Sequence, residues 1–151
     1  MNRRTYIRQA IALAAFAVVM PLGTGVSAKD SDAVNVDVRV IRVSTEGAAH
    51  VDSKLDDIKP KLLKAFDGYK KFLPMSRTKA GIKRGTTHSF SLPDGTQLRI
   101  TPEKRSGNEL RLGIELGKKF RTKVRVSPGN TFFQAGLPYK GDILVIAITA
   151  R

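Results

Sequence analysis

Residues 110–116 read Leu-Arg-Leu-Gly-Ile-Glu-Leu and carry the clearest structural signal in the chain. Apolar residues occupy every second position of this segment. Successive side chains of a β-strand point to opposite faces of the sheet. The pattern therefore predicts a strand with one face in a hydrophobic core and the other face in water.

Similar segments lie on both sides of it, separated by turn signals. Residues 93–95 (Pro-Asp-Gly) and 127–130 (Ser-Pro-Gly-Asn) are typical of tight turns. Residues 136–141, which contain two glycines and a proline, are expected to form a loop. The strands expected in this part of the chain are residues 86–92, 97–101, 110–116, 120–126 and 131–135.

Two further strands are expected nearer the ends of the chain. Residues 143–149 are almost continuously apolar, which favours a central strand buried on both faces. Residues 34–40 alternate strictly between valine and polar residues, whereas Ile41 and Val43 have the opposite phase. The change of phase predicts a β-bulge, or burial on both faces, near the end of this strand.

One segment has the three- and four-residue spacing of an amphipathic helix. Its apolar positions are Leu55, Ile58, Leu62, Phe66 and Tyr69. Asp52 or Ser53 can cap its start, but Pro60 would disturb a helix interior and is tolerated only in a first turn. We therefore expect a separate turn over residues 53–58 and a short helix over residues 59–67.

Together these segments predict an α+β fold that is mostly β. Residues 69–75 are expected to form an edge strand, because Pro74 cannot donate a ladder hydrogen bond. The chain then has seven or eight short strands and one short helix. Strands at this spacing favour an antiparallel sandwich or a partly open barrel.

The first 28 residues have the three parts of a cleavable signal peptide. Three arginines precede an apolar segment at residues 10–20, and Val26-Ser27-Ala28 is a small-residue cleavage signal before Lys29. A membrane anchor would need about 20 predominantly apolar residues, whereas residues 21–28 include Pro, Gly, Thr and Ser. We expect residues 1–28 to be removed and residues 29–151 to form a single β-rich domain.

Two resemblances concern the class of protein. Residues 2–8 (Asn-Arg-Arg-Thr-Tyr-Ile-Arg) resemble a twin-arginine signal, with Asn2 in place of the usual Ser or Thr. Both twin-arginine and general export stay open, and either implies an exported bacterial protein, periplasmic or secreted. Residues 92–95, 110–116 and 136–150 resemble a type of short exported bacterial protein that is abundant and uncharacterised. That resemblance implies no particular activity.

The composition is that of a globular and strongly basic domain. The 151 residues include 27 Lys and Arg against 13 Asp and Glu, a formal charge of +14. Removal of residues 1–28 takes away three arginines and no acid, which leaves +11. The chain has no cysteine, which excludes disulfides, thiolate zinc sites, iron–sulfur clusters and thiol catalysis.

No residue set in the sequence specifies a reaction. No serine lies in a Gly-x-Ser-x-Gly motif, His50 is expected in a loop, and His88 shares its strand phase with Phe90 and Leu92. We interpret His88 as a hydrogen-bonded core or edge residue, and we expect no catalytic site and no cofactor. The alternative is a small secreted hydrolase that uses His88 or His50 with a carboxylate.

A metal site is not expected either. Metalloprotease and calcium-loop motifs are absent from the sequence, and the histidines have no partner at ligand spacing. The acidic cluster comprises Asp52, Asp56 and Asp57. Helix capping and the helix dipole explain it without a metal ion.

Uneven positive charge is the one functional signal. Residues 68–93 and 116–141 contain no acid. A hairpin of residues 110–116 with 120–126 would place Glu115 near Arg121, Gly113 opposite Lys123 and Arg111 near Arg125. A net positive stripe would remain on one sheet face. The binding residues predicted from this pattern are Lys118, Lys119, Arg121, Lys123 and Arg125.

We therefore expect a non-enzymatic binding or assembly module of the bacterial envelope. Its partner would be an anionic component (lipid head group, polysaccharide or cell-wall polymer) or an envelope protein. Nucleic acid is not expected, because the chain is exported and has few aromatics for base stacking. The alternatives are a face that serves solubility alone and a protein–protein subunit that pairs through the edge strand at residues 69–75. No membrane span is expected after cleavage.

Overall fold

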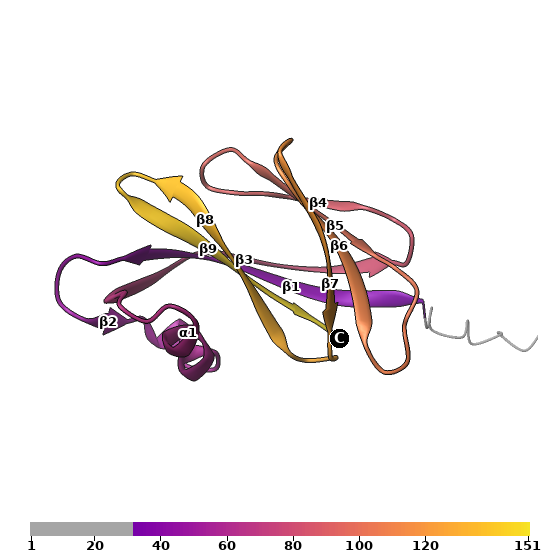
Figure 1. The fold of residues 1–151 in the computed structure, drawn as a ribbon, viewed down its shortest axis with the longest axis horizontal. Helices are drawn as coiled ribbons and strands as arrows, with labels where there is room; N and C mark the ends of the chain where they lie inside the picture. The colour runs from indigo at the N-terminus through magenta and orange to yellow at the C-terminus, as the bar shows by residue number, and fades with distance from the viewer. Residues whose placement is uncertain (1–31) are drawn as a thin grey trace, which may run out of the picture.

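The computed structural model describes residues 32–151 and arranges them as two β-sheets and a short helix (Figure 1). The predicted signal peptide lies outside the described residues. Sheet A has the strand order β2-β3-β1-β9-β8, and sheet B has the order β4-β5-β6-β7. The elements are β1 (Ala33–Ser44), β2 (His50–Val51), η1 (Ser53–Leu55), α1 (Lys59–Ala65), β3 (Lys71–Lys83), β4 (His88–Ser91), β5 (Gln97–Pro102), β6 (Leu110–Leu116), β7 (Phe120–Val126), β8 (Thr131–Tyr139) and β9 (Asp142–Ala150).

The predicted class is confirmed: the fold is mostly β, with two packed sheets, and neither sheet closes into a barrel. Neighbouring strands are antiparallel except β2 and β3, which pair in parallel over two residues each. β2 contains His50, so the predicted loop at that residue is wrong. A strand as short as β2 leaves no alternation to detect, and the structure accordingly has more strands than the sequence predicted.

Two strands are longer than expected. β3 continues to Lys83, although only residues 69–75 were predicted to be extended. β8 continues through the predicted loop to Tyr139, because a register shift between Ala135 and Leu137 takes up Gly136, whose φ is +110°. The hairpin to β9 is then closed by the short Lys140-Gly141 turn.

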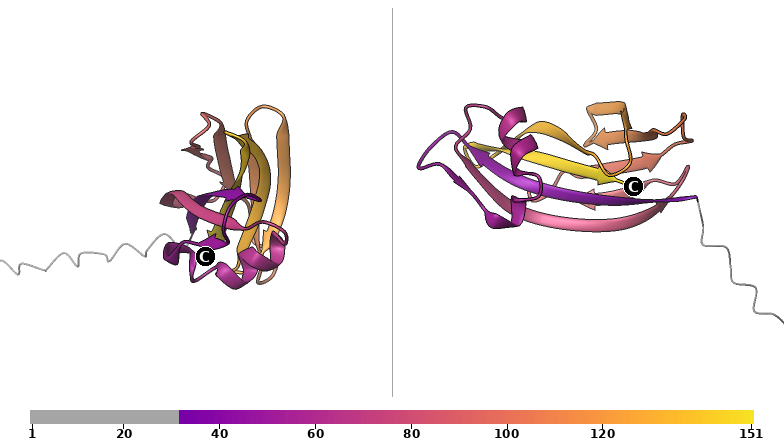
Figure 2. Two further views of the ribbon diagram at one scale, coloured as in Figure 1. Left: turned by 90° about the vertical axis from the view of Figure 1, so that its left-hand side faces the viewer. Right: turned by 90° about the horizontal axis from the view of Figure 1, so that it is seen from below.

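Sheet A is buried on opposite faces at its two ends (Figures 1 and 2). At one end, a face that includes Val34–Val40 at alternate positions packs against sheet B to form core 1. At the other end, the reverse face packs against η1 and α1 to form core 2, which contains Ile41, Val43, Leu62 and Phe72. Both cores are built from residues between 34 and 150.

This arrangement explains the phase change in β1. Val34, Val36, Val38 and Val40 point into core 1, whereas Ile41 and Val43 point from the other face into core 2. Of the two expectations for this strand, burial on both faces is confirmed, since β1 alternates without interruption and pairs with β9 in an unbroken register. The bulge lies on the neighbouring strand instead. Val40 pairs with Ser76 and Ile41 with Pro74, so Met75 of β3 has no partner on β1.

The helical region follows the sequence prediction. A short η1 turn precedes α1, and Pro60 lies in the first turn of α1, where its missing N–H costs no helix bond. The Asp52 carboxylate caps η1 by accepting a hydrogen bond of 2.9 Å from the Lys54 backbone N–H. Leu55, Ile58 and Leu62 are buried against sheet A.

Three linked ion pairs lie on the part of sheet A beside α1. The Arg39 guanidinium donates two hydrogen bonds to Asp57, at 2.7 and 2.5 Å, and so ties the turn before α1 to β1. Arg77 of β3 donates to Asp37, which lies 3.9 Å from Arg39. Asp37 and Arg39 are only 6% and 7% exposed. Hydrogen bonding to Arg39 holds the pKa of the Asp57 carboxyl below its ordinary value.

Replacing Leu62 with alanine should lower the free energy of unfolding by about 2–5 kcal/mol, because the change opens a cavity in core 2. Leu62 is 0% exposed, whereas the adjacent Leu63 is 40% exposed. Leu63→Ala is therefore the matched control and should change stability by no more than about 0.5 kcal/mol. Urea unfolding measures both changes. Equal losses in the two variants would contradict the placement of α1 on sheet A.

Replacing Asp57 with asparagine should destabilise the protein at pH 7 by about 1 kcal/mol. The folded-state pKa of Asp57 lies below its ordinary value of 3.8, so its contribution is complete above that value and is lost as the pH falls through the folded-state pKa. Urea unfolding of both proteins from pH 7 to pH 3 should therefore show the difference shrinking below about pH 4.

Asp56→Asn provides the control, because the Asp56 side chain is exposed and makes no ion pair with any residue from 32 to 151. Its stability should follow that of the unmodified chain over the same range. A difference for Asp57→Asn that stayed constant down to pH 3 would contradict an ionised Asp57 held by Arg39.

Candidate functional site

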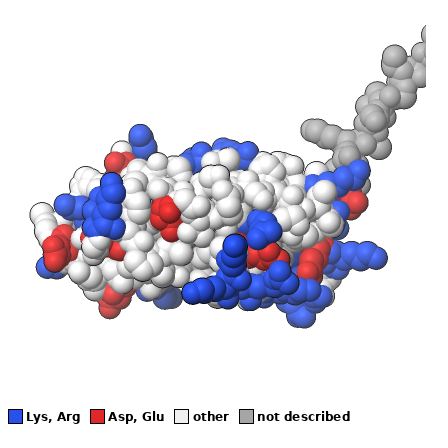
Figure 3. Space-filling view, turned by 90° about the horizontal axis from the view of Figure 1, so that it is seen from above, with Lys and Arg blue, Asp and Glu red and all other residues white. Residues whose placement is uncertain are grey.

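The outward face of sheet B carries the predicted binding residues. β6 and β7 pair in the register expected from the sequence, with Glu115 opposite Arg121, Gly113 opposite Lys123 and Arg111 opposite Arg125. Leu110, Leu112, Ile114 and Leu116 point the other way, into core 1. We use the name basic face for Arg99, Arg111, Arg121, Lys123 and Arg125 together with Lys118 and Lys119 of the hairpin turn. Figure 3 shows Lys and Arg gathered toward the end of the molecule that contains sheet B.

Carboxylates neutralise part of this face. Glu115 lies 2.9 Å from Arg121 and 3.5 Å from Arg99, so it is shared between two strands that flank β6. The Lys123 ammonium lies 2.8 Å from a Glu103 oxygen. Three of the cations therefore already have a carboxylate partner.

The pair of Lys123 with Glu103 was not foreseen from the sequence. Glu103 follows β5, and its carboxylate lies above Gly113 of the intervening strand. A β-carbon built on Gly113 would be 3.8 Å from Glu103 Oε1 and 3.5 Å from the Thr101 carbonyl oxygen. Glu103 therefore crosses directly over Gly113 to reach Lys123. The sequence signal was a single glycine in an otherwise alternating strand, which marks a close approach.

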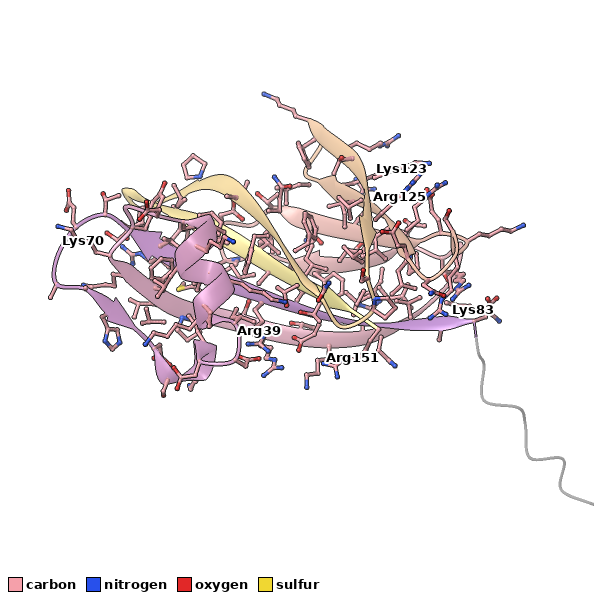
Figure 4. All side chains as sticks on the ribbon, turned by 60° about the horizontal axis from the view of Figure 1, so that its bottom comes forward. Arg39, Lys70, Lys83, Lys123, Arg125 and Arg151 are labelled. Atoms are coloured by element: carbon pink, nitrogen blue, oxygen red, sulfur yellow. The ribbon has the colours of Figure 1, made fainter. Side chains whose placement is uncertain are left out.

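The remaining cations have no carboxylate partner within residues 32–151: these are Arg111, Lys118, Lys119 and Arg125. Arg111 and Arg125 face each other directly across β6 and β7. With Lys123 and Val124 they line a shallow hollow of about 320 Å³. Figure 4 shows Lys123 and Arg125 close together on β7. Two arginines side by side, without an acid between them, can donate hydrogen bonds to phosphate or carboxylate oxygens.

The two histidines lie on different sheets. His50 is exposed on β2, and His88 is exposed on β4 with its ring 4.7 Å from the Phe90 ring. Neither makes a hydrogen bond or an ion pair with a carboxylate of the described part of the chain. The described residues therefore do not bring together the histidine–carboxylate pair that the hydrolase alternative requires. Nor do they contain a group of three His, Asp or Glu side chains that could hold a metal ion.

The predicted edge at residues 69–75 is partly covered. β2 pairs with Lys71 and Phe72, and the Asp52 N–H donates to the Phe72 carbonyl. Beyond Phe72, β3 has β1 as its only neighbouring strand in the region the structure describes. Of the edge strand predicted at residues 69–75, only residues 73–75 therefore belong to the open part of the β3 edge.

No protein-family model, curated protein or solved structure matches the chain.

From residue 32 onward, no helix combines the length and the apolar composition needed to cross a bilayer.

Replacing Glu103 with glutamine should strengthen retention on a sulfonate cation-exchange resin, because it releases Lys123 from its carboxylate partner beside Arg111 and Arg125 on the basic face. Asp67→Asn removes the same charge from the exposed segment after α1 and is the matched control. The Glu103 variant should elute at a higher salt concentration than the Asp67 variant. Elution of both at the same salt concentration would show that net charge, and not the basic face, governs binding.

Proposed function

We propose that this protein is a non-enzymatic binding module of the bacterial envelope that attaches to an anionic surface through the basic face. The observation that carries the proposal is a group of four cations on and beside β6 and β7 that have no carboxylate partner among residues 32–151. Arg111 and Arg125 lie at the open end of the β6–β7 hairpin, and Lys118 and Lys119 lie in the turn at its other end.

The flatness of the site favours a surface as the partner. The hollow at Arg111 and Arg125 is shallow, and the cations are spread over three strands and a turn. Each exposed Lys or Arg near an anionic membrane contributes about 1 kcal/mol at low screening. Four such residues can hold a small domain on a surface without a deep pocket.

The sequence supplies the cellular context of the proposal. A signal peptide over residues 1–28 would place residues 29–151 outside the cytoplasm, in the periplasm or beyond. The anionic groups available there are the phosphates of lipid head groups and the phosphates and carboxylates of polysaccharides and cell-wall polymers. These groups share the chemistry that the basic face would recognise.

The test is co-sedimentation of residues 29–151 with phosphatidylglycerol vesicles at low and moderate salt. Binding should fall steeply between about 50 and 300 mM salt, because screening shortens the reach of exposed charges. Lys119→Gln with Arg125→Gln should weaken vesicle binding by about tenfold or more. A parallel measurement with isolated cell-wall polymer distinguishes a lipid from a polymer as the anionic surface.

The matched control is Lys59→Gln with Lys64→Gln, which removes the same charge from exposed positions on α1. This variant should retain most of the binding. Binding that is insensitive to salt, or equal weakening by the two double substitutions, would overturn the proposal.

A further inference from the structure

A second charged site lies at the end of sheet A that sheet B does not cover. Side chains from β1, β3 and β9 form its floor, and the loop after β1 and the turn between β8 and β9 form its rim. Together they enclose an open hollow of about 550 Å³, a volume within the range of small-molecule sites. We use the name end hollow for this site. The residues that matter for its chemistry are Arg42, Ser44, Glu46, Lys71, Lys140 and Asp142.

The position of the end hollow follows from the fold. Arg42 and Ser44 lie on the same face of β1 as the valines of core 1, but beyond the end of that core. Ser44 pairs with Lys71 of β3, and Arg42 pairs with Leu144 of β9. Ser44 and Lys71 are therefore held side by side on the sheet, and Arg42 lies next to Leu144 at the margin of core 1.

One ion pair orients the arginine. The Arg42 Nε–H donates to Asp142 Oδ2 at 2.5 Å, and the guanidinium lies 5.8 Å from the centre of the Tyr139 ring. The Ser44 hydroxyl and the Arg42 guanidinium hold the pKa of Asp142 below its usual value, so this carboxylate is ionised at neutral pH. Since Asp142 uses only Nε, the two terminal nitrogens of Arg42 have no acceptor in residues 32–151.

Two lysines add further donors. Neither Lys71 nor Lys140 is within ion-pair distance of a carboxylate in the described chain. A β-carbon on Gly47 would lie 3.4 Å from Lys71 Nζ, so the backbone of the loop after β1 approaches this ammonium closely. The φ of +84° favours glycine at position 47.

Lys140 is held in an unfavourable backbone conformation. Its φ of +48° is the only positive value among the non-glycine residues from 32 to 151. Short hairpin turns of this kind favour asparagine at such a position, and a residue with a β-carbon there costs about 1–2 kcal/mol. The turn nevertheless places the Lys140 ammonium 5.4 Å from the Tyr139 ring, on the rim of the end hollow. Backbone strain of this kind is concentrated at binding sites.

We infer that the end hollow binds the phosphate group of a small molecule. Arg42, Lys71 and Lys140 offer donors from three different segments, which suits a tetrahedral anion better than a planar carboxylate. Asp142 fixes Arg42, and Glu46 supplies an acceptor for a hydroxyl group carried by the ligand. The end hollow shares no residue with the basic face, so this inference goes beyond the proposed function and does not depend on it.

The experiment is a titration of 15N-labelled residues 29–151 with inorganic phosphate at pH 7, followed by amide chemical shifts. Sodium chloride at equal ionic strength is the reference. Phosphate should cause saturable shifts in residues 42–47, 71 and 139–142, with half-saturation at or below about 10 mM. Lys71→Gln with Lys140→Gln should weaken this binding by about tenfold or more.

The control is Lys118→Gln with Lys119→Gln, which removes the same charge from the basic face and should leave phosphate binding at the end hollow unchanged. Glu46→Gln should fold normally and tighten binding of inorganic phosphate, because it removes a repulsive charge. This variant keeps the test decisive if the double lysine variant is unstable. The inference would be overturned if sodium chloride at equal ionic strength caused the same amide shifts as phosphate. Equal phosphate binding by the two double variants would also overturn it.

Two further ligands identify the source of the phosphate. Tighter binding of glycerol phosphate than of inorganic phosphate would support a phosphomonoester such as a soluble head group. Weaker binding of glycerol phosphate would support the free anion. Malonate tests the anion geometry, since binding of malonate as tight as that of phosphate would overturn the preference for a tetrahedral group.

Discussion

Sheet A is covered on one half of each face, by sheet B on one face and by α1 on the other, and the rest of the structure depends on this arrangement. Sheet B covers one face at one end of the strands, and α1 covers the other face at the other end. Burial of apolar surface drives both contacts, so each half of each face must be apolar or polar according to what covers it. β1 shows this directly, because its buried residues change from Val34–Val40 on one face to Ile41 and Val43 on the other.

The charged clusters of sheet A lie on the halves of its faces that neither hydrophobic core occupies. On the face beside α1, Asp37, Arg39 and Arg77 pair with one another and with Asp57, and the charges cancel. On the face beside sheet B, Arg42 pairs with Asp142, whereas Lys71 and Lys140 have no carboxylate partner among the described residues. The first cluster fastens α1 to the sheet. The second leaves donors directed into an open hollow, and this difference is why one is structural and the other is a candidate site.

Sequence patterns predicted the elements whose burial is regular. Residues 110–116 and 143–149 became β6 and β9 because their side chains meet a continuous core on one face or on both. Residues 76–83 of β3 escaped prediction, since this strand has few buried positions and exposes Arg77 and Lys79. Such charges protect an edge strand from pairing with other chains, and they also remove the alternation that would reveal the strand.

In the candidate sites, contacts within one hairpin could be predicted from the sequence, and contacts between more distant strands could not. The cross-strand pairs of β6 and β7 could be predicted, because a short hairpin fixes its own register. The contact of Glu103 with Lys123 and the grouping of Arg42 with Lys71 and Lys140 could not, since they depend on strand order across whole sheets. Their different shapes bear on what they can bind. Cations spread over the flat face of sheet B can contact many anionic groups at once. The three cations around the end hollow can instead direct their donors at a single anionic group.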